Sequence, residues 1–342
     1  MKKFCSKILI FSLPFFILSI EVFLPLHTFT YRPWEALLYR KKHGIGYPFY
    51  PNQRLSFQSV GDLAHHTNYA VFKNENWITD EFGYRNDVFI KSPNIVLIGD
   101  SFIAGSGLPQ DSTLTNLLMS KLNTKVYNFA PATFNDFISF YKNKIIDKPS
   151  LIIFSIVEKN IPDSIIKGST VNVNRKSESE ISIMKDKLMR LYSINYFKAR
   201  IFNEQGIGIK GEKDTSMFFL EGKNQFYQYN KLEYISNTII SYKDFCNSIG
   251  VDFIFLPIPN KETVYFDRVS LNIQPDFIFK LTSILASKGV KTINTLSLFN
   301  KERRVNDLLL YHLDDTHWNS RGVNLVSNAI VQKIVNQYRL LK

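Results

Sequence analysis

Two distant positions in the chain carry the residue types that nucleophilic acyl chemistry needs. Ser101 follows an apolar run and a glycine in the stretch IVLIGDSFIAG, and His317 lies in LDDTHWN, with Asp315 and Asp314 shortly before it. A serine hydroxyl is a weak nucleophile until a base takes its proton, and a histidine oriented by a carboxylate supplies that base. The pattern predicts a catalytic unit of Ser101, His317 and one of the two aspartates.

The apolar runs around these motifs predict an α/β domain that places the serine at a sheet edge. Runs without polar alternation are typical of a parallel sheet with helices on both faces. Ligands of such sheets bind beyond the carboxyl ends of the strands, and Ser101 follows the first predicted strand. Strands are expected at 94–98, 125–129, 151–157, 251–256 and 291–294, and helices at 114–122, 135–146, 232–248, 275–287 and 319–340.

These features resemble the SGNH/GDSL hydrolase superfamily, whose nucleophile motif is GDS and whose C-terminal block supplies Asp and His. Three further stretches are similar to the SGNH-like domain of alginate O-acetyltransferase-type proteins, namely SIVEKN, LPIPNKETVY and DDTHWNSRG. The resemblance runs from about Phe82 to the C-terminus, without an inserted region. It implies a three-layer α/β/α, flavodoxin-like fold and a serine acyltransferase or esterase.

The resemblance also implies roles for individual residues. The acetyltransferase-type branch has its aspartate two residues before the histidine, which corresponds to Asp315, whereas simpler esterases have it three before, which corresponds to Asp314. The superfamily forms its oxyanion hole from the backbone N–H of the serine, a glycine after the second strand and an asparagine after the third. The second block here lacks the glycine, so the resemblance implies a backbone donor at Thr133 or Ala132, with Asn160 as the third donor.

Several other residues have both a functional and a structural interpretation. Trp318 could line an acyl or sugar pocket or pack at the start of a helix, and Lys261 could contact substrate or lie in a solvated loop. Glu158 and Lys159 could form a structural or substrate-binding pair. No His and Cys cluster has metal-ligand spacing, so neither a metal nor a cofactor is expected. The GxGxxG match at 206–211 lacks the strand and helix that a nucleotide site needs.

The N-terminus predicts an export signal. Three lysines within the first seven residues precede the largely apolar stretch 8–26, and no small-residue cleavage site follows it. We therefore expect an uncleaved signal anchor over residues 1–30, with a cleaved signal peptide as the alternative. Positive charge at the N-terminus keeps that end in the cytoplasm, so the remainder is expected in the periplasm or otherwise outside the cytoplasm.

The remainder divides into two parts by composition. Residues 31–92 predict an irregular extension of short strands and loops, and residues 93–342 predict the SGNH-like catalytic domain. Within that domain the alternation of strands and helices fails over 163–229, which predicts an insertion over the sheet. Cys246 is expected to be a buried thiol, because the second cysteine lies in the N-terminal apolar segment.

Composition and charge narrow the class of function. The 342 residues are 45% hydrophobic with only two cysteines, which excludes a disordered or disulfide-stapled protein. The net charge of +12 would suit an anionic glycan or a membrane surface. The basic residues form no stripe interleaved with aromatic residues, so no nucleic-acid partner is expected.

The sequence leaves three functions open. The first is an envelope-anchored O-acyltransferase that moves acetyl groups to an exported polysaccharide through an acyl-serine, a step that only the resemblance implies. Its donor would be a multi-pass membrane acyltransferase partner. The second is an esterase that removes acyl groups from a glycan or lipid, and the third is a non-catalytic glycan-binding or assembly protein on the same fold.

Overall fold

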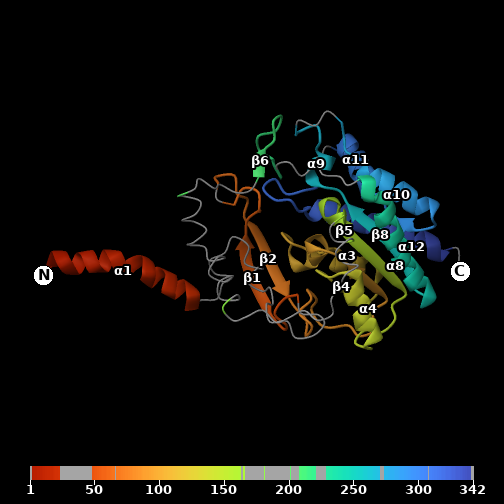
Figure 1. The fold of residues 1–342 in the computed structure, drawn as a ribbon, viewed down its shortest axis with the longest axis horizontal. Helices are drawn as coiled ribbons and strands as arrows, with labels where there is room; N and C mark the ends of the chain where they lie inside the picture. Colours follow the sequence, from red (N-terminus) through yellow and green to blue (C-terminus); the bar gives the residue numbers. More distant parts are fainter. Residues whose placement is uncertain are drawn as a thin grey trace.

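The computed structural model describes residues 2–23, 48–65, 67–162, 165, 181, 201, 208–220, 229–269, 273–306 and 308–339. Its centre is a sheet in the order β4-β3-β5-β8-β9, in which every neighbouring pair is parallel (Figure 1). The predicted parallel α/β fold is confirmed, and all five predicted strands are present. The strands are β3 (Ile95–Ile98), β4 (Val126–Phe129), β5 (Leu151–Val157), β8 (Asp252–Ile258) and β9 (Lys291–Thr292).

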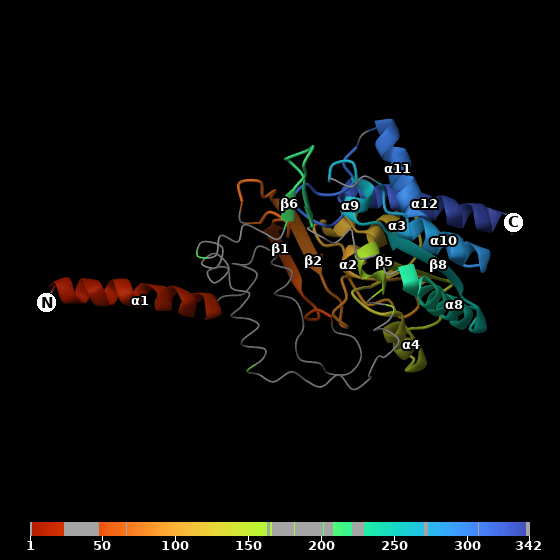
Figure 2. The same ribbon diagram turned by 45° about the horizontal axis from the view of Figure 1, so that its top comes forward.

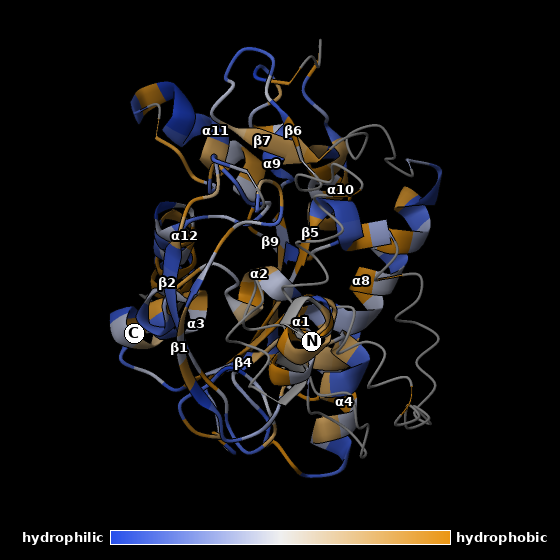
Figure 3. Cartoon of the chain, turned by 90° about the vertical axis from the view of Figure 1, so that its left-hand side faces the viewer, coloured by the Kyte–Doolittle hydropathy of each residue, from blue (hydrophilic) through white to orange (hydrophobic). Residues whose placement is uncertain are grey.

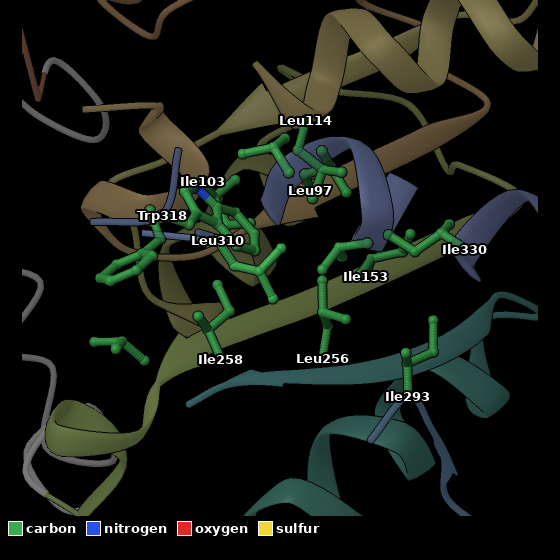
Figure 4. Close-up of a cluster of buried hydrophobic side chains, with 14 of the residues drawn as sticks. Leu97, Ile103, Leu114, Ile153, Leu256, Ile258, Ile293, Leu310, Trp318 and Ile330 are labelled. Atoms are coloured by element: carbon green, nitrogen blue, oxygen red, sulfur yellow. The ribbon is translucent and has the colours of Figure 1, made fainter. Parts of the chain in front are cut away.

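Apolar side chains alternate along the strands and build a core on each face of the sheet. Leu97 and Ile153 belong to one core, which Figure 4 shows in part, whereas their neighbours Val96 and Ile152 belong to the other. The first core is covered by α3 (Leu114–Leu122), α11 (Thr295–Asn306) and α12 (Ser320–Arg339). The second is covered by α4 (Phe134–Lys142), α8 (Leu232–Ser248) and α10 (Phe277–Ser287). This second core includes the buried thiol of Cys246.

The strand order fixes where a ligand could bind. The chain passes from β3 outward to β4 and then returns to the other side of β3 as β5. Loops that leave neighbouring strands in opposite directions open a crevice at their carboxyl ends, here between β3 and β5. Short helices begin at these ends: α2 (Ser101–Ala104) after β3, a 3-10 turn (Glu158–Asn160) after β5, and α9 (Lys261–Val264) after β8.

The N-terminal extension contains a regular hairpin that packs against the loops at this edge. Strands β1 (Arg54–Ser59) and β2 (Lys73–Ile78) pair antiparallel, and both lie beside the main domain in Figures 1 and 2. Arg85, which follows them, is fully buried and donates hydrogen bonds to the carbonyls of Ala104, Gly105 and Leu108. The extension therefore holds the segment that comes directly after α2.

The described part of the predicted insertion is a second small hairpin. Strands β6 (Gly208–Lys210) and β7 (Phe218–Leu220) pair antiparallel, and the N–H of Phe218 donates to the carbonyl of Leu313 at 2.9 Å. Gly208 belongs to β6, so the described part of the GxGxxG match forms a strand and opens no helix. Most of the rest of the predicted insertion lies outside the described residues.

The N-terminal helix α1 (Lys2–Phe23) presents apolar side chains to its surroundings. Phe4, Ile10, Phe11 and Phe15 are each exposed by more than half, and Figure 3 colours much of this helix, seen end-on, as hydrophobic. Over the residues that the structure describes, none of the helices combines the length and apolar character needed to cross a bilayer. The predicted signal anchor therefore stays a prediction.

Candidate active site

The turn after β3 presents Ser101 at the first position of α2. Asp100 is the N-cap of this helix, because its Oδ1 accepts the N–H of Phe102 at 3.0 Å. Its Oδ2 accepts the N–H of Val157 at 2.9 Å and so ties the turn to the end of β5. At Gly99 a Cβ would lie 2.8 Å from the carbonyl oxygen of Ser155, which explains the glycine in the motif. Asp100 thus fixes the turn.

His317 and Asp315 meet this serine from the loop before α12. Ser101 Oγ lies 2.8 Å from His317 Nε2, and His317 Nδ1 lies 2.7 Å from Asp315 Oδ1. The same aspartate oxygen also accepts the backbone N–H of His317 at 3.0 Å. The rings of Phe102 and His317 pack with centroids 4.7 Å apart. This arrangement orients the imidazole so that Nε2 can accept the serine proton.

Asp314 has a different set of partners, all from the extension. Its Oδ2 accepts the N–H groups of Gly61 at 2.7 Å and Val71 at 2.8 Å, and its Oδ1 accepts Lys73 Nζ at 3.0 Å. The Asp314 side chain is fully buried, and a Cβ on Gly61 would lie 2.0 Å from the Asp314 carbonyl oxygen. The structure therefore resolves the choice between the aspartates, because Asp315 faces His317. Asp314 joins the loop before α12, here called the histidine loop, to the extension.

Two further charged groups, Asp62 and Lys261, hold the loop. This role was not predicted from the sequence for either of them. Asp62 accepts the N–H and the hydroxyl of Thr316, both at 2.9 Å. Lys261 Nζ donates to the carbonyls of His312, Leu313 and Asp315 at 2.6, 2.8 and 3.1 Å. Burial lowers the pKa of Lys261 to about 8, partly offset by nearby carboxylates. The backbone around Asp315 and His317 is thus fixed from both sides.

The predicted substrate contacts at Lys261 and Trp318 are wrong for this structure. Lys261 is 1% exposed and its ammonium is directed into the loop, so it is a buried structural cation. Trp318 is fully buried and packs edge-on against Phe102 with ring centroids 5.7 Å apart. Figure 4 shows Trp318 in the apolar cluster beside Ile103 and Leu310. The aromatic ring at the helix start belongs to the core.

The predicted oxyanion donors fall into two groups, those already used in other hydrogen bonds and those not. The N–H of Thr133 donates to Asp136 Oδ2 at 2.8 Å as part of a capping box, and the N–H of Ala132 donates to the carbonyl of Gly99 at 2.9 Å. Both donors are occupied, so the assignment of Thr133 is wrong. The backbone N–H of Ser101 and the half-buried side chain of Asn160 make no hydrogen bond within the described part of the chain. These two groups lie at the ends of neighbouring strands.

Glu158 and Lys159, beside Asn160, form a structural connection. Glu158 is 1% exposed, and its Oε2 accepts the N–H of Asn260 at 2.9 Å and the hydroxyl of Thr263 at 2.7 Å. The N–H of Lys159 donates to Asn260 Oδ1 at 3.0 Å. These bonds join the carboxyl ends of β5 and β8 next to the site.

A metal ligand set and a second histidine also lie near the site. Within the described residues, Asp62, Asp315 and His317 offer ligand atoms within 4.8 Å of one another. Their oxygen and nitrogen atoms already bond Thr316 and each other, which suits an acyl-transfer triad better than a metal site. His312 Nε2 is enclosed and has no hydrogen-bond partner among the described residues, and burial lowers the pKa of His312 to about 4. His312 is therefore neutral at physiological pH.

Comparisons with known proteins give a distant likeness in fold. No protein-family model matches the chain, and no curated protein matches its sequence. Structure neighbours include a member of the lipolytic protein G-D-S-L family from Veillonella parvula, with 11% identity, a TM-score of 0.38, and coverage of 70% of this chain and 96% of that one. A catalytic mutant of an acetylxylan esterase from Geobacillus stearothermophilus has 14% identity, a TM-score of 0.37, and coverage of 72% and 95%. A lipase/acylhydrolase from Enterococcus faecalis has 13% identity, a TM-score of 0.38, and coverage of 72% and 97%.

Proposed function

We propose that the protein is a serine acyl-transfer enzyme that carries an acyl group on Ser101 and passes it to a hydroxyl of an exported polysaccharide. The observation that carries the enzymatic part is the continuous chain from Ser101 Oγ through both ring nitrogens of His317 to Asp315, with separations of 2.8 and 2.7 Å. Hydrogen bonds of this length let the histidine accept the serine proton while the buried aspartate orients the histidine. The serine oxygen thereby becomes a stronger nucleophile.

In the first half-reaction the serine takes the acyl group from its donor. His317 Nε2 accepts the Ser101 proton while Oγ attacks the acyl carbonyl, which forms a tetrahedral oxyanion. Asp315 accepts the hydrogen bond from Nδ1–H, remains ionised and stabilises the imidazolium that forms. The imidazolium then donates its Nε2 proton to the leaving group as the bond between the carbonyl carbon and that group breaks. The products are acyl-Ser101 and the free donor alcohol or thiol.

In the second half-reaction the acyl group leaves the serine. His317 accepts a proton from the acceptor hydroxyl, whose oxygen attacks the acyl carbonyl, and the proton returns to Ser101 Oγ as the ester bond breaks. We assign the oxyanion in both steps to the N–H of Ser101 and the side-chain amide of Asn160. Each preorganised donor of this kind lowers the barrier by about 2.7 to 4 kcal/mol.

Hydrolysis is the second candidate, because the two outcomes differ only in the acceptor. Asp315 and His317 are buried, but Ser101 is partly exposed, so solvent can approach an acyl group on Oγ. Transfer requires that a sugar hydroxyl compete with that water. The net charge of +12 supports an anionic polysaccharide as the acceptor.

A location at the outer side of the cytoplasmic membrane is part of the proposal. The lysines at the start of α1 and the exposed apolar side chains along it support attachment to a membrane. Acetyl-CoA is a cytoplasmic donor, so a multi-pass membrane acyltransferase would have to deliver the acetyl group to Ser101. Protease added to spheroplasts should digest the domain that follows α1, and protection of that domain until the membrane is lysed would contradict this location.

Intact-mass spectrometry after exposure to p-nitrophenyl acetate tests the chemistry. The wild-type protein should gain one acetyl group, and Ser101→Ala should gain none. Added glycan oligomers should become acetylated faster than free acetate appears if the protein is a transferase, whereas acetate release independent of glycan would indicate an esterase. No adduct and no turnover in either protein would leave a binding or assembly role and refute both enzyme functions.

A further inference from the structure

Lys73, on β2 of the extension, is a buried cation that faces the two carboxylates of the histidine loop. Its side chain is 7% exposed, and its Nζ lies 3.0 Å from Asp314 Oδ1 and 3.9 Å from Asp315 Oδ2. Asp315 uses its other oxygen, Oδ1, for His317. The lysine therefore lies on the far side of the catalytic carboxylate from the imidazole, although it comes more than 240 residues earlier in the chain.

The other charged groups around Asp315 have different tasks. Lys261, from α9, directs its ammonium to three backbone carbonyls of the loop. Asp62, from the extension, accepts hydrogen bonds from Thr316. His312, on the loop itself, is neutral at physiological pH because burial lowers its pKa to about 4. Among these groups, Lys73 is the cation whose charge is directed at the side chains of Asp314 and Asp315.

We propose that Lys73 is a positioning residue of the active site: it fixes Asp315 with Oδ1 toward His317 and holds that carboxylate ionised. The inference rests on the proposed acyl-transfer function and deepens it, because it makes the N-terminal extension part of the catalytic unit. An ammonium 3.9 Å from a buried carboxylate favours its charged form and restricts its rotation. Lys73 itself touches neither Ser101 nor His317 and acts through Asp315.

This role predicts a specific kinetic pattern for the neutral variant Lys73→Met. Loss of the cation lets the carboxylate rotate, so kcat for p-nitrophenyl acetate should fall about 10- to 100-fold, well short of the roughly 10⁴-fold loss from removing the carboxylate charge itself. KM should stay the same, because Lys73 does not contact the substrate.

The experiment uses the full-length chain in four forms: wild type, Lys73→Met, Lys73→Arg and the control Lys210→Met. Lys210, on β6, places its ammonium over the ring of Tyr69 and makes no ion pair with the histidine loop. Lys73→Arg should recover most of kcat, and Lys210→Met should match the wild type. Wild-type kcat in Lys73→Met would overturn the proposal.

A double variant separates positioning from simple neutralisation of Asp314. Lys73→Met combined with Asp314→Asn removes both charges of the buried pair, so no uncompensated charge remains to unfold the protein. If Lys73 positions Asp315, this double variant should keep the reduced kcat. A return to wild-type kcat would show that Lys73 serves only Asp314, and would overturn the proposal.

A proton NMR measurement distinguishes failure of this inference from failure of the proposed function. The His317 Nδ1 proton bonded to Asp315 should give a downfield resonance that is present in wild type and Lys73→Arg, absent in His317→Gln, and broadened or lost in Lys73→Met. This signal does not depend on any substrate. If Ser101→Ala and wild type were equally inert while the signal changed as expected, the acyl-transfer function would fail and the role of Lys73 would stand. An unchanged signal in Lys73→Met would refute that role.

Discussion

Separate replacement of the two adjacent aspartates should give opposite phenotypes. In Asp315→Asn the side chain keeps its size, but the amide no longer stabilises the imidazolium and favours the wrong tautomer of His317. The loss of turnover for this change in a serine triad is about 10⁴-fold, equivalent to about 5.4 kcal/mol in the barrier. Because the amide oxygen can still accept a hydrogen bond, thermal stability should change little.

Asp314→Ala should instead reduce stability. The change removes the acceptor for the N–H groups of Gly61 and Val71 and leaves the buried ammonium of Lys73 without its 3.0 Å partner. Breaking a buried ion pair costs about 3 to 5 kcal/mol, and each orphaned N–H about 1 to 3 kcal/mol, with partial relief because water enters and Lys73 keeps Asp315 Oδ2 at 3.9 Å. A net loss of about 4 kcal/mol is a large part of a typical domain's 5 to 15 kcal/mol. At about 2 °C per kcal/mol, Tm should fall by about 8 °C.

The assay combines two measurements on the full-length chain. Initial rates with p-nitrophenyl acetate at 15 °C report turnover of the folded protein, and differential scanning calorimetry reports Tm. Asp315→Asn should lose turnover at nearly wild-type Tm, whereas Asp314→Ala should lose Tm and retain far more turnover. The reverse pattern, with Asp314→Ala inactive at wild-type Tm and Asp315→Asn active, would refute the assignment of the two carboxylates.

Three further predictions concern the site and its support. Asn160→Ala should lower kcat about 10²- to 10³-fold with little change in KM, as expected for an oxyanion donor, and an unchanged kcat would exclude that role. Gly61→Ala places a Cβ 2.0 Å from the Asp314 carbonyl oxygen and should lower the free energy of unfolding by about 3 kcal/mol in urea titrations. A free energy of unfolding equal to that of the wild type would contradict the predicted clash. His312 has its pKa lowered to about 4 by burial, so the unfolded chain binds a proton more readily, and stability should fall by about 2 kcal/mol from pH 7 to pH 5. His312→Gln should lack this part of the pH dependence, and an identical dependence in both proteins would refute it.

Local sequence patterns predicted much of the sheet, because its strands are short apolar runs with a single interpretation. Residues 151–157 are buried throughout, which a continuous run such as LIIFSIV requires. Helix α11 was not predicted, since its sequence TLSLFNKERRVN is largely polar and buries chiefly Leu296 and Phe299. Tertiary packing of a narrow apolar stripe, rather than a strong local pattern, determines that helix.

The site was predictable where its residues follow motifs and not where they depend on distant contacts. Ser101 and His317 stand in recognisable local sequences, whereas the choice between the adjacent aspartates depends on the extension. Lys73 carries no local signal of its role, because only folding brings it to the histidine loop. The role of Thr133 could have been predicted from the sequence. A threonine three residues before Asp136 at a helix start indicates a capping box, which occupies the N–H of Thr133.

The junction between the extension and the histidine loop also has a consequence for the order of folding. Gly61 and Asp314 are 253 residues apart, and Ser101 and His317 are 216 apart, so both contacts close very long loops. Contacts of such separation form late, because loop-closure entropy must be overcome first. During synthesis the extension and the nucleophile emerge well before their partners, so a nascent chain cannot complete the triad. Activity should therefore appear only when the C-terminal segment, with His317 and α12, packs against the sheet.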